Sequence, residues 1–178
     1  MRPPIPDKVA PPYPIRYENR IIVGFGRGSS ELGIPTANVP VDDRLNALDP
    51  GIYFGWCRVS PSDTVSRVEH CDHHREVTFN YGRDLIPSER VCLPMVMSVG
   101  WNPFYHNKEK AAEIHVIYKF EQNFYGANVN LAILGYIRPE LDYTNKEALI
   151  EDIMLDIKTA KAALERSEYK AYEHLVEL

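Results

Sequence analysis

Residues 112–120 read Ala-Glu-Ile-His-Val-Ile-Tyr-Lys-Phe, and this stretch decides the fold class. Its apolar residues recur at every second position: Ile114, Val116, Tyr118 and Phe120. The positions between them carry most of its polar residues: Glu113, His115 and Lys119. A period of two predicts a half-buried strand, with one face in the core and the other in water. One wet face is typical of an antiparallel sheet.

Further strands are expected on both sides of this stretch. Residues 128–137 continue the alternation, with one apolar face made of Val129, Leu131 and Ile133. Upstream, β-branched and aromatic residues predict strands at 21–25, 51–59, 76–81 and 91–99. Pro94 lacks an N–H donor, so it places the last of these at a sheet edge or beside a bulge. Several short strands separated by turns predict a small antiparallel barrel.

The C-terminal part of the chain has a different period. Apolar residues recur there at helical spacing: Leu149, Ile153, Ile157, Ala160 and Leu164. Thr144 and Glu147 have the spacing of a capping box, which marks the start of a helix. We therefore predict a helix over 145–166 that packs on the barrel, and a second, shorter helix within 167–178. Strands followed by helices indicate a mainly β domain with a helical tail.

Length and composition limit the class of protein. The chain has 178 residues, enough for one domain, and its net charge of −5 argues against a nucleic-acid binder. Its three cysteines are an odd number without close spacing, which favours a reducing compartment and a cytoplasmic protein. We expect a proline-rich arm over 1–17 and one domain over 18–178. Within that domain, the barrel extends to about 143, the helical tail covers 144–178, and a long segment covers about 61–92. We expect no segment that spans a membrane. The sequence contains no heptad repeat, so we expect a monomer.

The densest local signal lies over residues 24–38. Gly24, Gly26 and Gly28 alternate there, which lets a backbone approach phosphate oxygens closely. The segment fits neither a Walker A loop nor a dinucleotide fingerprint, so by itself it is either a turn or a nucleotide site. In the extended Pro-Thr-Ala-Asn stretch that ends it, Thr36 and Asn38 point the same way. Their neutral oxygens suit Mg²⁺, or they hydrogen-bond a turn.

Six ordered segments together resemble the riboflavin kinase family, in its monofunctional eukaryotic form. They are residues 24–38 (Gly-Phe-Gly-Arg-Gly-Ser, then Leu-Gly-Ile-Pro-Thr-Ala-Asn), 51–56 (Gly-Ile-Tyr-Phe-Gly-Trp), 98–103 (Ser-Val-Gly-Trp-Asn-Pro), Glu113 with His115, 123–126 (Asn-Phe-Tyr-Gly) and 135–140 (Gly-Tyr-Ile-Arg-Pro-Glu). The resemblance covers about residues 18–166.

The resemblance implies a six-stranded antiparallel Greek-key β-barrel with a C-terminal helix. It implies transfer of the ATP γ-phosphate to riboflavin to give FMN, with Glu113 as catalytic base. Thr36 and Asn38 are then ligands of a divalent metal, Mg²⁺ with Zn²⁺ as the alternative. The residues implied for ATP are Gly24, Arg27, Ser30, Val116, Tyr118 and Tyr125, and those implied for flavin are Arg138, Leu141 and Tyr143. A rival reading is a non-catalytic flavin- or nucleotide-binding barrel, which has no use for Glu113.

Overall fold

The structure is a computed structural model, and it describes residues 4–22, 36–62, 67–70, 76–101, 110–121, 124–141 and 145–177. Side chains at 67–70, 76–78 and 146 are not part of this description. Within the described ranges, no helix has the length and apolarity that crossing a bilayer requires.

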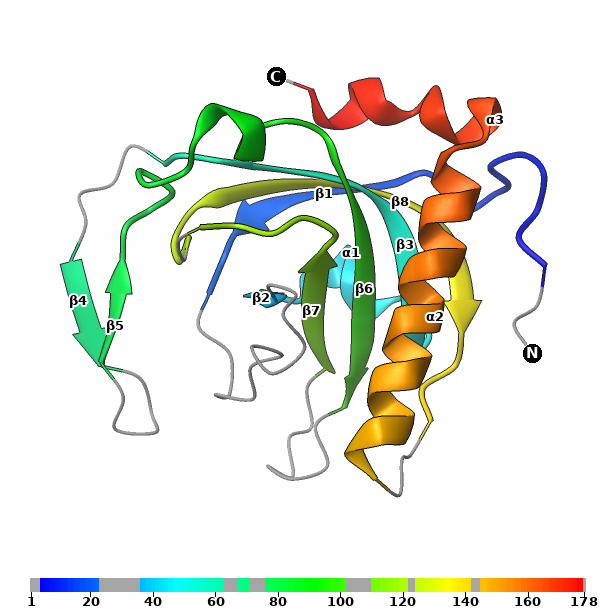
Figure 1. Cartoon of the computed structure of the whole chain (residues 1–178), viewed down its shortest axis with the longest axis horizontal. Helices are drawn as coiled ribbons and strands as arrows, with labels where there is room; N and C mark the ends of the chain where they lie inside the picture. Colours follow the sequence, from blue (N-terminus) through cyan, green and yellow to red (C-terminus); the bar gives the residue numbers. More distant parts are fainter. Residues whose placement is uncertain are drawn as a thin grey trace.

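A curled six-stranded sheet forms the body of the protein (Figure 1). Its strands are β1 (Ile15–Arg20), β2 (Thr36–Val39), β3 (Gly51–Ser60), β6 (Leu93–Trp101), β7 (Lys110–Val116) and β8 (Asn128–Arg138). They pair in the order β1-β8-β3-β6-β7-β2, and every pair is antiparallel. An isolated bridge from Ile22 to Asn38 joins the chain after β1 to the opposite edge strand. The predicted mainly β fold of six antiparallel strands with a C-terminal helix is confirmed.

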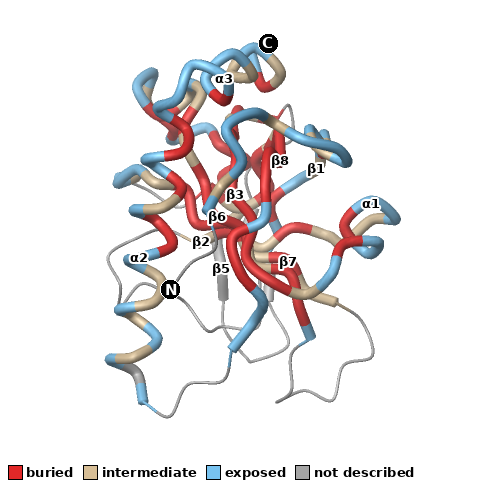
Figure 2. Tube along the Cα trace, turned by 90° about the vertical axis from the view of Figure 1, so that its right-hand side faces the viewer, coloured by how far each residue is buried: buried red, intermediate tan, exposed pale blue. Residues whose placement is uncertain are grey.

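Two apolar layers lie on the two faces of this sheet. The inner layer fills the curl and includes Val129, Leu131 and Ile133, the predicted apolar face of β8. The outer layer lies between the sheet and the helices, and takes Ala132 and Leu134 from the same strand. Figure 2 shows buried positions along the strands and alternating burial along the helix beside them. Alternate residues of β8 therefore pack in two different apolar layers, one on each face of the sheet.

Helix α2 (Lys146–Leu164) is the predicted long helix. Four residues of the predicted stripe pack in the outer layer (Ile153, Ile157, Ala160 and Leu164), whereas Leu149 is exposed. The N-cap is Asn145, whose side chain accepts a hydrogen bond from the Ala148 N–H. The predicted capping box named Thr144 instead, and Thr144 lies outside the described residues. The short helices α3 (Ser167–Lys170) and η4 (Glu173–Val176) bear out the second helical region, while α1 (Asp43–Asn46) was not predicted.

Strand β1 covers Ile15–Arg20, starts directly after Pro14 and was not predicted. Of the strand predicted over 21–25, Ile22 forms the bridge to Asn38, and residues 23–25 lie outside the described residues. The prolines before β1 suggested an arm continuing to residue 17. As an edge strand, β1 needs ladder hydrogen bonds on one side only, and it finds them on β8.

Of the two places predicted for Pro94, a sheet edge or the side of a bulge, the sheet edge is wrong. Strand β6 lies in the interior of the sheet, between β3 and β7. Pro94 is the second residue of β6, and its carbonyl accepts a hydrogen bond from the N–H of Ile117, just beyond β7. Proline is tolerated near the start of a strand because only one donor is lost there.

The segment over 61–92 contains structure of its own. Strands β4 (Arg67–His70) and β5 (Glu76–Phe79) form a two-stranded sheet, which stands on the far side of the molecule from α2 (Figure 1). Of these, β4 was not predicted. The short helix η2 (Pro87–Glu89) follows, and the buried Glu89 carboxylate accepts hydrogen bonds from the N–H groups of Ile86 and Glu121. This contact ties the segment to the chain that leaves β7.

The proline-rich stretch before β1 lies against the C-terminal helices. Ile5 and Val9 pack on the outer layer. The Tyr169 hydroxyl donates to the Pro6 carbonyl at 2.7 Å, and Arg166 donates to the Ile5 carbonyl at 3.1 Å. Residues near the two ends of the chain are therefore joined.

Candidate active site

One continuous row of residues crosses five strands of the sheet. It runs from Arg138 on β8 to Ile52, Ser98, Glu113 and finally Asn38 on β2, each directly paired with the next. Neighbouring strands lie about 4.8 Å apart, so three steps separate Arg138 from Glu113 by roughly 14 Å. The row thus brings a predicted flavin residue, the predicted base and a predicted metal ligand onto one line.

The predicted base and metal ligands share the outer face of the sheet. Ala37 pairs with Ile114, and both belong to the inner core. Because side chains alternate along a strand, Thr36, Asn38 and Glu113 point to the opposite side. The predicted juxtaposition of these three side chains therefore agrees with the register of β2 and β7.

Glu113 lies half-buried in this site. Burial raises the pKa of its carboxyl group, and a hydrogen bond from the Thr36 hydroxyl lowers it in part. Burial favours the neutral acid because a carboxylate loses hydration there. A carboxylate with a raised pKa accepts a proton more readily, which is what a general base requires.

Of the residues predicted for ATP, Val116, Tyr118 and Tyr125 lie within the described chain. Val116 is buried in the inner core at the end of β7. Tyr118 is partly exposed, and its hydroxyl lies 3.1 Å from Ser88 Oγ. Tyr125 packs against Phe79, with ring centroids 5.8 Å apart. Val116 and Tyr118 come after Glu113 in the chain. Lys110, which pairs with Trp101, comes before Glu113 at the start of β7.

Two of the residues predicted for flavin, Arg138 and Leu141, lie where β8 ends. The Arg138 side chain is buried and paired with Asp156 of α2. Leu141 is 54% exposed, and Trp101 at the end of β6 is 47% exposed.

Gly24, Arg27, Ser30 and Tyr143 lie outside the described residues. Their predicted roles stay predictions.

No site role was predicted from the sequence for three polar residues that lie in the row or beside it. Asp156 falls within the apolar stripe of α2, between Ile153 and Ala160, and a carboxylate at such a position signals a buried ion pair. Glu140 lies over Gly100, where a Cβ atom would come 2.2 Å from either carboxylate oxygen. Ser98 Oγ lies 3.5 Å from Glu140 Oε1. No periodicity in the sequence distinguishes Glu140 from a solvated loop residue.

The burial of His115 contradicts the prediction that the polar face of β7 is exposed to water. His115 is 9% exposed, because the outer face of the sheet here is covered rather than open to water. Its Nδ1 has no hydrogen-bond partner among the described residues. Burial lowers the pKa of His115 to about 4, and the Asp156 carboxylate opposes this in part. His115 is therefore neutral at physiological pH.

This burial makes stability depend on pH. Between pH 4 and 6.5 the unfolded chain binds a proton at His115 that the folded chain does not, so the free energy of unfolding falls on acidification through this window. The full effect is on the order of 3 kcal/mol. Urea unfolding of the wild type and His115→Gln between pH 5 and 7.5 should show a flatter pH dependence in the variant. Parallel curves would mean that His115 is accessible to protons in the folded state.

Comparisons with known proteins agree over most of the chain. The Flavokinase family model, described as riboflavin kinase, matches residues 11–164. The riboflavin kinase of Scheffersomyces stipitis is 57% identical over 171 residues, or 96% of each chain. That of Lodderomyces elongisporus is 55% identical over 175 residues, covering 97% of this chain and 96% of the other. The crystal structure of riboflavin kinase from Trypanosoma brucei has a TM-score of 0.63 at 21% identity, covers 93% of this chain and 88% of that one, and shows the same fold.

The family model and the curated relatives together define an enzyme of the kinase class, and the curled antiparallel sheet with its covering helix agrees with them. The family match covers more than half of the chain, and the curated relatives are aligned over nearly all of it. The chain belongs to the riboflavin kinase family.

Proposed function

We propose that this protein transfers the γ-phosphate of ATP to the ribityl 5′-hydroxyl of riboflavin, giving FMN and ADP. The observation that carries the proposal is the position of Glu113 within the row, directly between Asn38 on β2 and Ser98 on β6. In this proposal the carboxylate lies between the neutral oxygens of Thr36 and Asn38 and the end of β8, where we expect the flavin.

Glu113 serves as the general base in this proposal. The 5′-hydroxyl is a weak nucleophile while it holds its proton, and the carboxylate accepts that proton as the oxygen attacks phosphorus. The Thr36 hydroxyl, through its hydrogen bond, orients the carboxylate. Phosphoryl transfer needs little covalent chemistry from the protein, so positioning and charge stabilisation supply most of the rate.

Thr36 and Asn38 suit a divalent cation. They offer a hydroxyl and an amide oxygen on one face, next to a carboxylate. No group of three His, Cys, Asp or Glu side chains able to hold a metal occurs among the described residues. In this proposal the cation takes the neutral oxygens of Thr36 and Asn38 together with phosphate oxygens. That donor set favours Mg²⁺ over Zn²⁺. A bound cation would neutralise the charge of the phosphates.

The two substrates approach the base from opposite directions in this proposal. The acceptor lies toward the end of β8, where Leu141 and Trp101 are exposed. The nucleotide lies toward the end of β7, where Val116 and Tyr118 follow Glu113. We place the protein in the cytoplasm, since Cys57 and Cys92 are both free thiols.

Replacing Thr36 or Asn38 with alanine should raise the Mg²⁺ concentration needed for half-maximal activity by about tenfold or more, because loss of even an outer-shell partner costs that much. Mg²⁺ titration of FMN formation, with ATP in fixed excess, measures the effect. Thr159→Ala and Asn19→Ala are matched controls on α2 and β1, and both should titrate like the wild type. An unchanged titration in Thr36→Ala and Asn38→Ala would remove both residues from the metal site.

A further inference from the structure

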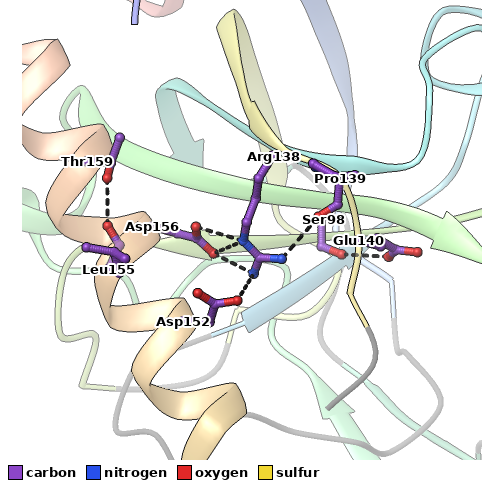
Figure 3. Close-up of polar contacts among 8 residues, drawn as sticks. All are labelled: Ser98, Arg138, Pro139, Glu140, Asp152, Leu155, Asp156 and Thr159. Carbon is purple, nitrogen blue, oxygen red and sulfur yellow. Dashed lines mark hydrogen bonds and ion pairs between the residues drawn. The ribbon is translucent and has the colours of Figure 1, made fainter. Parts of the chain in front are cut away.

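Arg138 is held by α2 through a buried ion pair (Figure 3). Its Nε lies 3.0 Å and 3.1 Å from the two carboxylate oxygens of Asp156, and its Nη2 lies 2.8 Å from Asp156 Oδ2. Asp152, one turn earlier on the same helix, lies 3.7 Å from Nη2. The side chains of Arg138 and Asp156 are only 6% and 2% exposed. The guanidinium group therefore faces the helix.

A buried ion pair of this kind is weak evidence for stability. Removing two charges from water costs about as much as their attraction returns, and apolar residues of similar size often serve as well. The forked geometry of Arg138 instead fixes direction, because its donors match the carboxylate in one orientation only. The pair is better explained by the part of the chain that it holds in place, the segment that follows β8.

The pair orients the chain that leaves β8. Arg138 Nη1 donates to the carbonyl of Pro139 at 3.2 Å, so the same guanidinium group that binds α2 also holds the next peptide. One residue further, the Glu140 carboxylate lies against Gly100 and Ser98 of β6. The helix thus holds the segment 138–140 through Arg138, and the Glu140 side chain extends toward the sheet on the other side, as Figure 3 shows. The exposed Leu141 follows directly.

The same segment is in register with the proposed base. Arg138 pairs with Ile52, Ile52 with Ser98, and Ser98 with Glu113. A shift of the segment would therefore change the distance between a flavin held beyond β8 and the carboxylate that activates it.

We propose that Arg138 is a positioning residue for riboflavin: with Asp156 it fixes the segment 138–141 and so sets the place of the acceptor relative to Glu113. It acts through this segment and not as a ligand of the flavin. The inference rests on the proposed function, since it concerns the acceptor of that reaction.

A double-mutant cycle tests this role. Arg138→Met and Asp156→Leu should each raise the dissociation constant of riboflavin, followed by flavin fluorescence, by about tenfold or more, since small misplacements are costly. The double variant should be no worse than Arg138→Met alone, because that change already breaks the ion pair with Asp156. It should also regain much of the melting temperature that the single variants lose. KM for ATP should stay within about twofold of the wild type in all three.

Trp56→Phe is the matched control. It removes the hydrogen bond from Trp56 Nε1 to the Tyr169 carbonyl in the same buried layer, without touching the segment 138–141. It should lower the melting temperature and leave riboflavin binding unchanged, which separates positioning from general loss of stability.

Two results would overturn the inference. Riboflavin affinity could stay at the wild-type value in the double variant, which would make the pair purely structural. Alternatively, Arg138→Met could weaken binding while Asp156→Leu does not, which would make Arg138 a direct ligand. Failure of the proposed function is distinguishable, because the wild type would then bind riboflavin without forming FMN, or would not bind it at all.

Discussion

Glu113→Gln should lower the rate of FMN formation by about 10²–10⁴-fold, the contribution typical of a general base. Glutamine keeps the size and hydrogen-bonding reach of the side chain but cannot take the hydroxyl proton. The pKa of the Glu113 carboxyl group is raised by burial, so the wild-type side chain is well suited to accept it. Initial rates of FMN formation at saturating riboflavin and ATP measure the loss.

The effect should fall on kcat and leave both KM values near those of the wild type, because the lost interaction is made only in the transition state. Glu18→Gln, the same change at an exposed position of strand β1, is the matched control and should leave the rate unchanged. A Glu113→Gln enzyme with more than a tenth of the wild-type kcat would remove Glu113 from the role of base.

Gly55→Ala should destabilise the fold by about 3 kcal/mol or more, at the upper end of what overpacking costs. A Cβ atom at Gly55 would lie 1.9 Å from the carbonyl oxygen of Ala132 on the neighbouring strand. Since the oxygen belongs to the backbone of β8, relief requires the strand to move. A domain stability of about 5–15 kcal/mol leaves little reserve for this. Urea unfolding curves measure the change.

Gly100→Ala is the matched comparison for this stability measurement. Its Cβ would also meet an atom at short distance, 2.2 Å, but that atom is the end of the Glu140 side chain, which can turn away. The loss of unfolding free energy should therefore be clearly smaller than for Gly55→Ala. Equal losses would show that the close approach of β3 and β8 is less rigid than the structure indicates.

The sequence predicts the elements that carry a clear period. The face of β8 made by Val129, Leu131 and Ile133 is in the core as expected, since alternation over ten residues leaves no other choice. Helix α2 was also predicted correctly, because its apolar residues recur at helical spacing. Glu113, Thr36 and Asn38 were predicted to act together, and the pairing of β2 with β7 makes them neighbours.

Features that depend on pairing between distant segments could not be predicted. The close approach at Gly55 arises from a register shift between β3 and β8 beside Phe54, which no local pattern encodes. His115 carries a polar side chain on the expected wet face, and only the cover over that face explains its burial. The partner of Arg138 lies 18 residues away on another element, so the sequence left open whether its charge faces a ligand or a helix.

The central claim is that this chain phosphorylates riboflavin at a site built around Glu113. Chromatography of riboflavin incubated with the purified protein, ATP and Mg²⁺ tests it most directly. We predict an FMN peak that disappears when ATP or the metal is omitted and when Glu113 is replaced by glutamine. Riboflavin that binds tightly but remains unphosphorylated under these conditions would contradict the account and favour a non-catalytic flavin-binding barrel.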